Sequence, residues 1–377
     1  MRNVRDIKLL ENVPVMVRAA LNVPIVDGQV TNTFRLRQAL PTIEYLQKRH
    51  ARVILVGHIG DKGTETLAPV AEAMREFIPR LIFCPLSTGP EARAAVRALV
   101  PGDVLMLENL RRHAGEKKND PEFAADLAEL ADVFVQDSFD VCHREHASVV
   151  GVPELLPSYA GLLVEKEVLE LTKALSPKRP SLAIIGGAKF STKQPVIKIL
   201  LERYDHVFVG GALSNDFLKA KGYPMEASLV SDVDQASIKE LLDHPRLVLP
   251  IDEIYAMPGS TAETGIAGML DGKAPYEAVL DNGPETISQL MELVKDAKTI
   301  LWNGPLGNYE KGFVEGTERL AESIAKSGAY SILGGGDTIA AVEKLGIGGH
   351  FSFISTGGGA MLDFMASGTL PGLKALS

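Results

Sequence analysis

Short hydrophobic runs alternate with longer amphipathic stretches along most of this chain. In the first half, the hydrophobic runs predict strands at 14–18, 52–56, 81–83, 104–107 and 132–135. The stretches between them repeat with a helical period and predict helices near 34–48, 66–78, 90–99 and 121–130. Strands that alternate with helices form right-handed βαβ units, so we expect a mostly parallel sheet with helices on both faces.

The alternation stops at about 151–160, where glycine and proline interrupt it, and it restarts in the second half. A long helical pattern from Leu162 to Leu175 lies between the two halves. It fits a helix that connects two lobes, although a surface helix of the first domain fits equally well. The second half predicts strands at 182–185, 207–209, 247–250, 298–302, 330–333 and 351–354. The stretch 255–280, which is rich in Gly, Pro and Ala, is expected to be irregular.

Length and composition limit the class of protein. A chain of 377 residues is too long for one ordinary core, so two domains are expected. The net charge of −9 argues against a general nucleic-acid binder. The two cysteines, Cys84 and Cys142, form no C-x-x-C motif, which excludes a disulfide framework or a zinc knuckle. The first apolar run, from Val13 to Pro24, contains a proline, an arginine and an asparagine, so no signal peptide or membrane span is expected. A cytoplasmic setting is the prediction.

Basic side chains follow the predicted strands of the first half. Ligands of parallel sheets bind beyond the carboxyl ends of the strands, so these positions are the ones to compare. They hold Arg18, Asn22, His58, Arg111, His143 and Arg144, and Arg35 opens the first predicted helix. Any one of them could be a solvated charge or a helix cap. Because guanidinium groups suit carboxylate and phosphate oxygens, the set as a whole predicts a site for a small anionic metabolite.

Glycine clusters occupy the corresponding positions of the second half. They are Gly186-Gly187, Gly210-Gly211, Gly334-Gly335-Gly336-Asp337-Thr338 and Ser355-Thr356-Gly357-Gly358-Gly359. Several clusters on one sheet edge indicate backbone amides that converge on a large anion, and a nucleotide is the natural candidate. Lys189 and Lys193 follow the first cluster, without the Walker spacing. Asp337 could cap its helix or, beside a polyphosphate, bind Mg²⁺.

Several of these strings resemble the phosphoglycerate kinase family, and they occur in the order of that family. The resemblance extends from about residue 4 to the C-terminus. It rests on Val17-Arg18, Asn22-Val23-Pro24, Leu107-Glu108-Asn109-Leu110-Arg111, His143-Arg144-Glu145-His146, Gly186-Gly187-Ala188-Lys189, Trp302-Asn303-Gly304-Pro305-Leu306-Gly307, Gly334-Gly335-Gly336-Asp337-Thr338 and Ser355-Thr356-Gly357-Gly358-Gly359-Ala360.

The resemblance implies two Rossmann-like lobes that face each other across a hinged cleft. It places a phosphoglycerate-binding lobe at 1–158, an inter-lobe helix and hinge at 159–176 and a nucleotide-binding lobe at 177–358. Residues 359–377 would return to the first lobe. The implied reaction moves phosphate between 1,3-bisphosphoglycerate and ADP, giving 3-phosphoglycerate and Mg·ATP. A monomer with small-molecule substrates, without nucleic-acid or membrane partners, is expected.

The family's functional residues can be carried over to matching positions. The resemblance implies Arg35, Lys189 and Gly336 as catalytic residues and Asp337 as the Mg²⁺ ligand. It implies that the acceptor is held by Asn22, Arg35, His58, Arg111 and Arg144. The implied nucleotide site comprises Gly186, Gly187, Lys193, Gly210, Gly211, Leu280, Asn303, Pro305, Glu310, Gly335, Gly336, Asp337 and Thr338.

Departures from the family pattern are concentrated on the acceptor side. Ala20 stands where the family has an aspartate, and Asp61 where it has an arginine. In addition, Asp140 and Val279 each replace a glycine. Losing two hydrogen bonds to charged groups would cost about 3–6 kcal/mol. We hypothesise that Lys62 or Arg112 restores the lost positive charge. Two alternatives remain open at this point: a related kinase for a different small carboxylate, and a catalytically weak nucleotide-binding protein.

Overall fold

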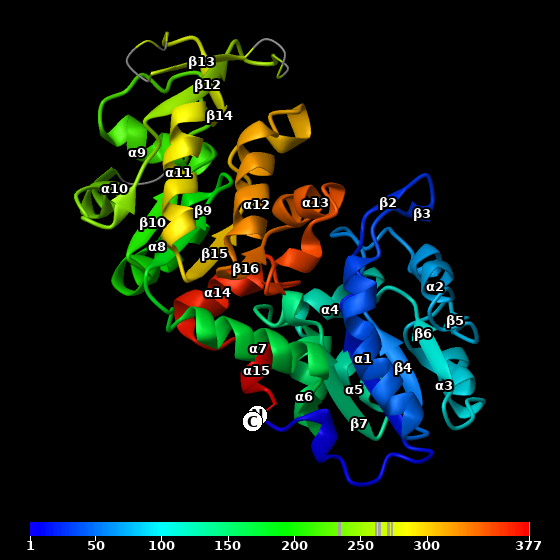
Figure 1. The fold of residues 1–377 in the computed structure, drawn as a ribbon. Helices are drawn as coiled ribbons and strands as arrows, with labels where there is room; N and C mark the ends of the chain where they lie inside the picture. The colour runs from blue at the N-terminus through cyan, green and yellow to red at the C-terminus, as the bar shows by residue number, and fades with distance from the viewer. Residues whose placement is uncertain (233–234, 261, 263–264, 270–271, 273, 377) are drawn as a thin grey trace. The chain divides into compact units, whose positions relative to one another are not determined.

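The chain folds into two compact units. The computed structural model describes residues 1–232, 235–260, 262, 265–269, 272 and 274–376. One unit comprises Met1–Leu169 with Ser367–Ser377, and the other comprises Glu170–Ala366 (Figure 1). The boundary between them lies inside helix α7 (Leu162–Ala174), whose predicted extent is correct to within one residue. None of the helices in the described ranges is long and apolar enough to cross a membrane.

The first unit is built around a parallel sheet of six strands. Their spatial order is β5-β6-β4-β1-β7-β8. The strands are β1 (Pro14–Ala19), β4 (Arg52–Val56), β5 (Ile82–Cys84), β6 (Val104–Leu107), β7 (Val133–Asp137) and β8 (Ser158–Ala160). The helices are α1 (Phe34–Lys48), α2 (Ala68–Met74), α3 (Gly89–Arg97), α4 (Ala114–Lys118), α5 (Pro121–Ala128) and α6 (Val152–Leu155). A small hairpin joins β2 (Ile25–Val26) to β3 (Gln29–Val30).

The central strand β1 explains why the hydrophobic runs of this unit are nearly continuous. All six of its residues are buried, and it pairs in parallel with β4 and with β7. Val15 and Val17 pack into the core on one face of the sheet, whereas Met16 packs into the core on the other. Because both faces are covered, neither set of alternating side chains can be polar along most of the strand.

The predicted strands of the first half are confirmed, with shifts of at most two residues at their ends. The predicted break at 151–160 is wrong in part. Residues 152–155 form α6, and β8 pairs with β7 through Phe134 and Ser158. A strand of three residues that directly follows Pro157 carries too little periodicity to be recognised from sequence.

The second unit has a parallel sheet of its own. Among its described residues, the order is β11-β10-β9-β15-β16-β17. The strands are β9 (Ser181–Ile185), β10 (His206–Val209), β11 (Leu247–Val248), β15 (Thr299–Asn303), β16 (Tyr330–Gly334) and β17 (Phe353–Ile354). The helices are α8 (Phe190–Arg203), α9 (Ala212–Ala220), α10 (Gln235–Leu242), α11 (Pro284–Asp296), α12 (Glu315–Ser327), α13 (Gly336–Lys344) and α14 (Gly359–Ser367). The two adjacent central strands, β9 and β15, are buried at every position.

A small antiparallel sheet corrects the expectation that 255–280 is irregular. It contains β12 (Asp252–Ala256), β13 (Ile266–Met269) and β14 (Ala278–Asn282), in the order β13-β12-β14. Two features hid it from the sequence analysis. The register of β12 against β14 shifts between Ile254 and Tyr255, and β12 buries the acidic side chains of Asp252 and Glu253. Several residues of the predicted irregular stretch, 261, 263–264, 270–271 and 273, lie outside the described residues.

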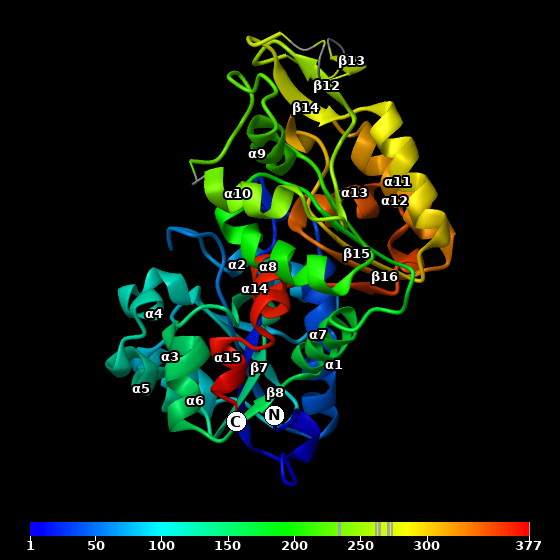
Figure 2. The same cartoon turned by 90° about the vertical axis from the view of Figure 1, so that its left-hand side faces the viewer.

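The last described residues of the chain pack on the first unit. Helix α15 (Pro371–Lys374) contacts the segment around Val149, and the amide of Gly372 donates to the carbonyl of Cys142 at 2.8 Å. A Cβ at Gly372 would lie 2.8 Å from the side chain of Val149, so glycine allows this close approach. Both ends of the chain lie close together in this unit (Figure 2).

Candidate active site

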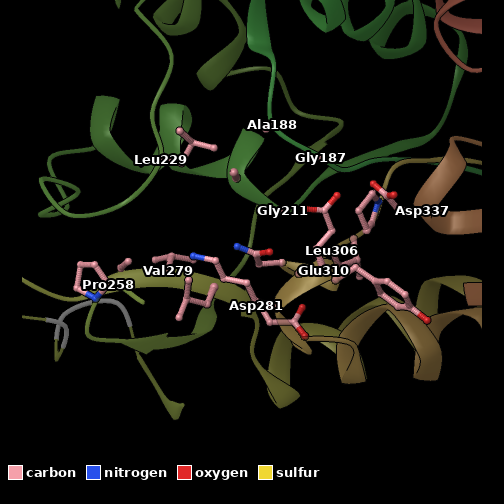
Figure 3. Close-up of a pocket in the computed structure, with 18 of the residues that line it drawn as sticks. Gly187, Ala188, Gly211, Leu229, Pro258, Val279, Asp281, Leu306, Glu310 and Asp337 are labelled. Atoms are coloured by element: carbon pink, nitrogen blue, oxygen red, sulfur yellow. The ribbon is translucent and has the colours of Figure 1, made fainter. Parts of the chain in front are cut away.

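A pocket of about 380 Å³ opens at the carboxyl ends of the second unit's strands. Its wall combines the turn after β9, the start of α9, the turn after β15 and strand β14. In Figure 3, Leu229, Pro258 and Val279 lie at one end of the pocket and Asp337 lies at the other. The pocket therefore has an apolar end, suited to a flat base, and a charged end at the mouth of α13.

Glycines allow the loops of this pocket to approach each other closely. A Cβ at Gly186 would lie 2.2 Å from the carbonyl oxygen of Pro305. Gly211 has a φ of +63°, and a Cβ there would lie 2.8 Å from the amide of Gly187. Real Cβ atoms do not tolerate such distances from backbone. The predicted glycine pairs are thus needed to join the strand-end loops into one wall.

Some of the predicted nucleotide residues line the pocket and others support it from behind. Those in the lining are Gly187, Gly211, Leu280, Pro305, Glu310 and Asp337. Thr338 is buried behind the wall, where its Oγ1 accepts from the amide of Gly304 at 3.1 Å. Asn303 is also buried, and its amide nitrogen lies 3.5 Å from Sδ of Met361. Gly210 packs on Asn282, whereas Gly336 begins α13 in open space.

Helix N-termini are arranged around the same strand ends. Helices α8, α9 and α13 begin after Lys189, Gly211 and Gly335, and no side chain caps these three N-termini. A helix N-terminus carries partial positive charge and unpaired amides, so it favours anions. The starts of these helices suit phosphate groups.

The two predicted lysines of this unit have different surroundings. Lys193 lies over the glycine turn, where its Nζ donates to the carbonyl of Gly186. Burial lowers the pKa of Lys193 to about 8, although the negative charge of Asp337 opposes the shift. Lys189, at the N-cap of α8, is exposed. The first lysine is thus held at the glycine turn, and the second can meet a ligand from solvent.

In the first unit, a buried arginine anchors the predicted acceptor site. The side chain of Arg18, at the end of β1, is 0% exposed. Its Nε donates to Oγ of Ser148 at 2.9 Å, and its Nη2 lies 3.0 Å from Nδ1 of His58. Ser148 in turn donates to the buried carboxylate of Glu116 at 2.6 Å. The charge of Arg18 is therefore balanced through a serine by an acid from α4.

This arrangement defines the state of His58. Arginine has only donors, so Nδ1 of His58 must accept, and the ring proton must lie on Nε2. Burial lowers the pKa of His58 well below its ordinary value, and the charges of Arg18, Arg111 and Arg35 add to the shift. His58 is thus a neutral side chain with one remaining N–H to offer.

The other predicted acceptor residues surround the loop that follows His58. The side-chain oxygen Oδ1 of Asn22 accepts from the backbone amide of Gly60 at 3.1 Å. The backbone carbonyl of Asn22 accepts from Nη1 of Arg35 at 2.7 Å. Arg111 donates to the carbonyl of Gly60 at 2.7 Å. The structure thus brings Asn22, Arg35, His58 and Arg111 together. Arg144 is exposed, and its positive charge contributes to the lowered pKa of Asp61.

Arg18 was expected at this site, but its burial was not. Three supporting residues were not expected from the sequence: Ser148, Glu116, and Lys117, whose Nζ lies 3.1 Å from Oδ1 of Asp61. A polar residue inside an apolar strand was the one available signal, for Arg18. Of the two cations proposed to compensate for Asp61, Arg112 is paired with Glu108 at 3.1 Å, and Lys62 is exposed.

The fold and the two sites fit an α/β phosphotransferase that uses a nucleotide. The phosphoglycerate kinase family model matches residues 4–368. Phosphoglycerate kinases of Moorella thermoacetica and Thermus thermophilus are each 44% identical to this chain. The matches cover 98% and 96% of it, and 97% and 96% of those proteins.

Solved structures give the same result. Phosphoglycerate kinase from Pyrococcus horikoshii has a TM-score of 0.90 at 32% identity, covering 100% of this chain and 98% of that one. The enzyme from Coxiella burnetii has a TM-score of 0.83 at 36% identity, covering 99% and 98%. The chain belongs to the phosphoglycerate kinase family. It is an ATP-dependent phosphotransferase with a carboxyl group as acceptor.

Proposed function

We propose that this chain catalyses reversible phosphoryl transfer between 1,3-bisphosphoglycerate and Mg·ADP, giving 3-phosphoglycerate and Mg·ATP, through the two sites described above. The main support for this reaction is the match to the family model over residues 4–368. No observation favours either alternative considered from the sequence, a different carboxylate acceptor or a protein that binds nucleotide without transfer.

The nucleotide is proposed to bind in the pocket of the second unit. Its base would lie against the apolar end at Leu229 and Val279, and Glu310 is available to the ribose. Its phosphates would meet Lys193, the glycine turn and the start of α13. These assignments are supported by the lining of the pocket and by the uncapped helix starts.

The acceptor is proposed to bind in the first unit, on Asn22, Arg35, His58, Arg111 and Arg144. The neutral ring of His58 can donate one hydrogen bond to an acceptor oxygen. Because Ala20 is buried and apolar, it adds no contact to the substrate hydroxyl. Recognition in this chain would therefore depend on the cations that bind the phosphate and the carboxylate.

The transfer itself requires positioning and charge neutralisation. The bond between the acyl oxygen and phosphorus breaks, and a bond forms between phosphorus and a terminal oxygen of ADP. Arg35, Lys189 and the amide of Gly336 are proposed to neutralise the charge on the transferred group. Bound Mg²⁺ would neutralise the nucleotide phosphates. Exposed Asp337 fits this role, since Mg²⁺ prefers one or two carboxylates together with phosphate oxygens. We also propose a cytoplasmic monomer.

A coupled assay with ATP and 3-phosphoglycerate tests the reaction, and Lys189→Ala tests the site. We expect the variant to lose roughly 10²–10³-fold in kcat, as when one charge-stabilising donor is removed. Lys198→Ala is the matched control, because Lys198 lies on the same helix and pairs with Glu240 on the surface. The site assignment fails if folded Lys189→Ala protein turns over like the control. The reaction assignment fails if wild-type protein binds Mg·ATP but does not phosphorylate 3-phosphoglycerate.

A further inference from the structure

Lys117 is a cation that the motifs of this chain do not single out, yet it lies within the acceptor cluster. It is on the last turn of α4, and its Nζ lies 3.1 Å from Oδ1 of Asp61. Arg111 Nη1 lies 3.3 Å from the same oxygen. One carboxylate oxygen thus joins two cations from separate segments of the chain.

Exposure separates the three members of this group. The side chain of Asp61 is 87% exposed and that of Lys117 is 44% exposed, whereas that of Arg111 is 11% exposed. The carboxylate is therefore the part that solvent reaches most easily. The hydrogen bond from Lys117 and its positive charge hold the pKa of Asp61 below its ordinary value, so the carboxylate is ionised.

The loop beneath Asp61 is fixed by contacts of its own. Asn109 accepts from Ile59 N and donates to the carbonyls of Ile59 and Glu65. A Cβ at Gly63 would lie 2.0 Å from the carbonyl oxygen of Arg111, so this turn packs directly on that backbone. Lys117 and Arg111 also donate to the backbone carbonyls of Asp61 and Gly60, and these contacts do not involve the Asp61 side chain.

We propose that Lys117 and Arg111 form the subsite for the phosphate group of the acceptor, with Asp61 as a resident counter-ion that the phosphate displaces. This inference rests on the proposed acceptor site in the first unit. Two cations held by one monoanionic carboxylate keep a net positive charge. A phosphate carries about −1.5 to −2 charges and three acceptor oxygens, so it satisfies both cations better than the carboxylate does. Asp61 then weakens acceptor binding instead of supporting it.

The steady-state KM for 3-phosphoglycerate tests this assignment, since the two partners of one ion pair should change it in opposite directions. Lys117→Met should raise the KM about 5- to 50-fold with little change in the KM for ATP. Asp61→Asn, which keeps the size of the side chain, should lower it severalfold. The inhibition constant of inorganic phosphate, measured in competition with 3-phosphoglycerate, should rise in Lys117→Met and fall in Asp61→Asn. The control is Lys118→Met, the exposed lysine next in the chain.

Each contrary result has a distinct meaning. If Asp61→Asn raises the KM as Lys117→Met does, the ion pair only braces the loop and the inference is overturned. It is also overturned if Lys117→Met behaves like Lys118→Met while Arg111→Ala still raises the KM. If Arg111→Ala leaves the KM unchanged as well, the proposed acceptor site itself is wrong. Thermal unfolding of each variant identifies any change that comes from misfolding.

Discussion

Nη2 of Arg18 and Nδ1 of His58 lie 3.0 Å apart, and both side chains are buried. This contact fixes a neutral histidine with its proton on Nε2. We therefore expect nitrogen-15 NMR of the ring to show the Nε2–H form at every pH from about 5.5 to 8, on either side of the ordinary histidine pKa. In the urea-unfolded chain, the same ring should titrate near pH 6.5. A titration near that pH in the folded protein would contradict the assignment.

The lowered pKa of Lys193 predicts a proton linkage of nucleotide binding. In the free protein this amine titrates at about 8, and nearby phosphates would raise its pKa. Binding of ADP at pH 8 should thus take up as much as about half a proton, and binding at pH 6.5 almost none. Calorimetry in buffers of different ionisation enthalpy measures this uptake.

The matched variant is Lys193→Arg, which stays charged at both pH values. It should bind ADP without the uptake at pH 8. Equal uptake by the variant and the wild-type protein would assign the proton to another group.

Asp337→Asn should raise the concentration of free Mg²⁺ needed for half-maximal activity by about tenfold or more, because an amide replaces a carboxylate ligand. Glu343→Gln, on the same helix, is the control. Titration of Mg²⁺ at saturating substrates makes the measurement. An unchanged Mg²⁺ requirement in Asp337→Asn would contradict the assignment of Asp337 as a Mg²⁺ ligand.

Asp137 predicts a pH dependence of stability. Its Oδ1 accepts from the amide of Leu163 at the start of α7, and burial raises its pKa to about 8. Because this pKa is raised above the unfolded value of 3.8, the stabilisation is fully present below about pH 4 and is lost as the pH rises towards 8. Asp137→Asn should remove this loss and be more stable than wild type at pH 8 by roughly a few kcal/mol.

Urea unfolding followed by circular dichroism at pH 5 and pH 8 makes the comparison. The control is Asp132→Asn, which changes an exposed aspartate just before the same strand. Parallel pH profiles for the wild-type protein and Asp137→Asn would show that this carboxyl is ionised in the folded state at both pH values.

The sequence predicts the two parallel sheets well, because strands buried on both faces are continuous apolar runs such as Val104–Leu107. Prediction from the sequence fails for strands that are not continuous apolar runs. In β12, the buried Glu253 accepts from Asn282 of β14, and this pairing replaces apolar packing. No periodicity within β12 can reveal a partner 29 residues away.

The candidate sites divide in the same way. Residues that follow strands, such as His58 and Asp337, can be predicted from the sequence, because the topology of parallel sheets places them at one edge. Lys117 cannot be predicted in this way, because its partner Asp61 is 56 residues distant in the sequence. The pair forms only after α4 and the loop that contains Asp61 are positioned. Local motifs therefore indicate the candidate ligand-binding residues. The charged side chains that pair with these residues depend on tertiary contacts.

The return of α15 to the first unit has a consequence for protein synthesis. Residues 170–366 form one uninterrupted segment, whereas the first unit is split between 1–169 and the final residues. As the chain leaves the ribosome, the second unit has its whole sequence before the first one does. The first unit is completed only when Gly372 reaches Cys142, so it is completed after the whole sequence of the second unit has been synthesised.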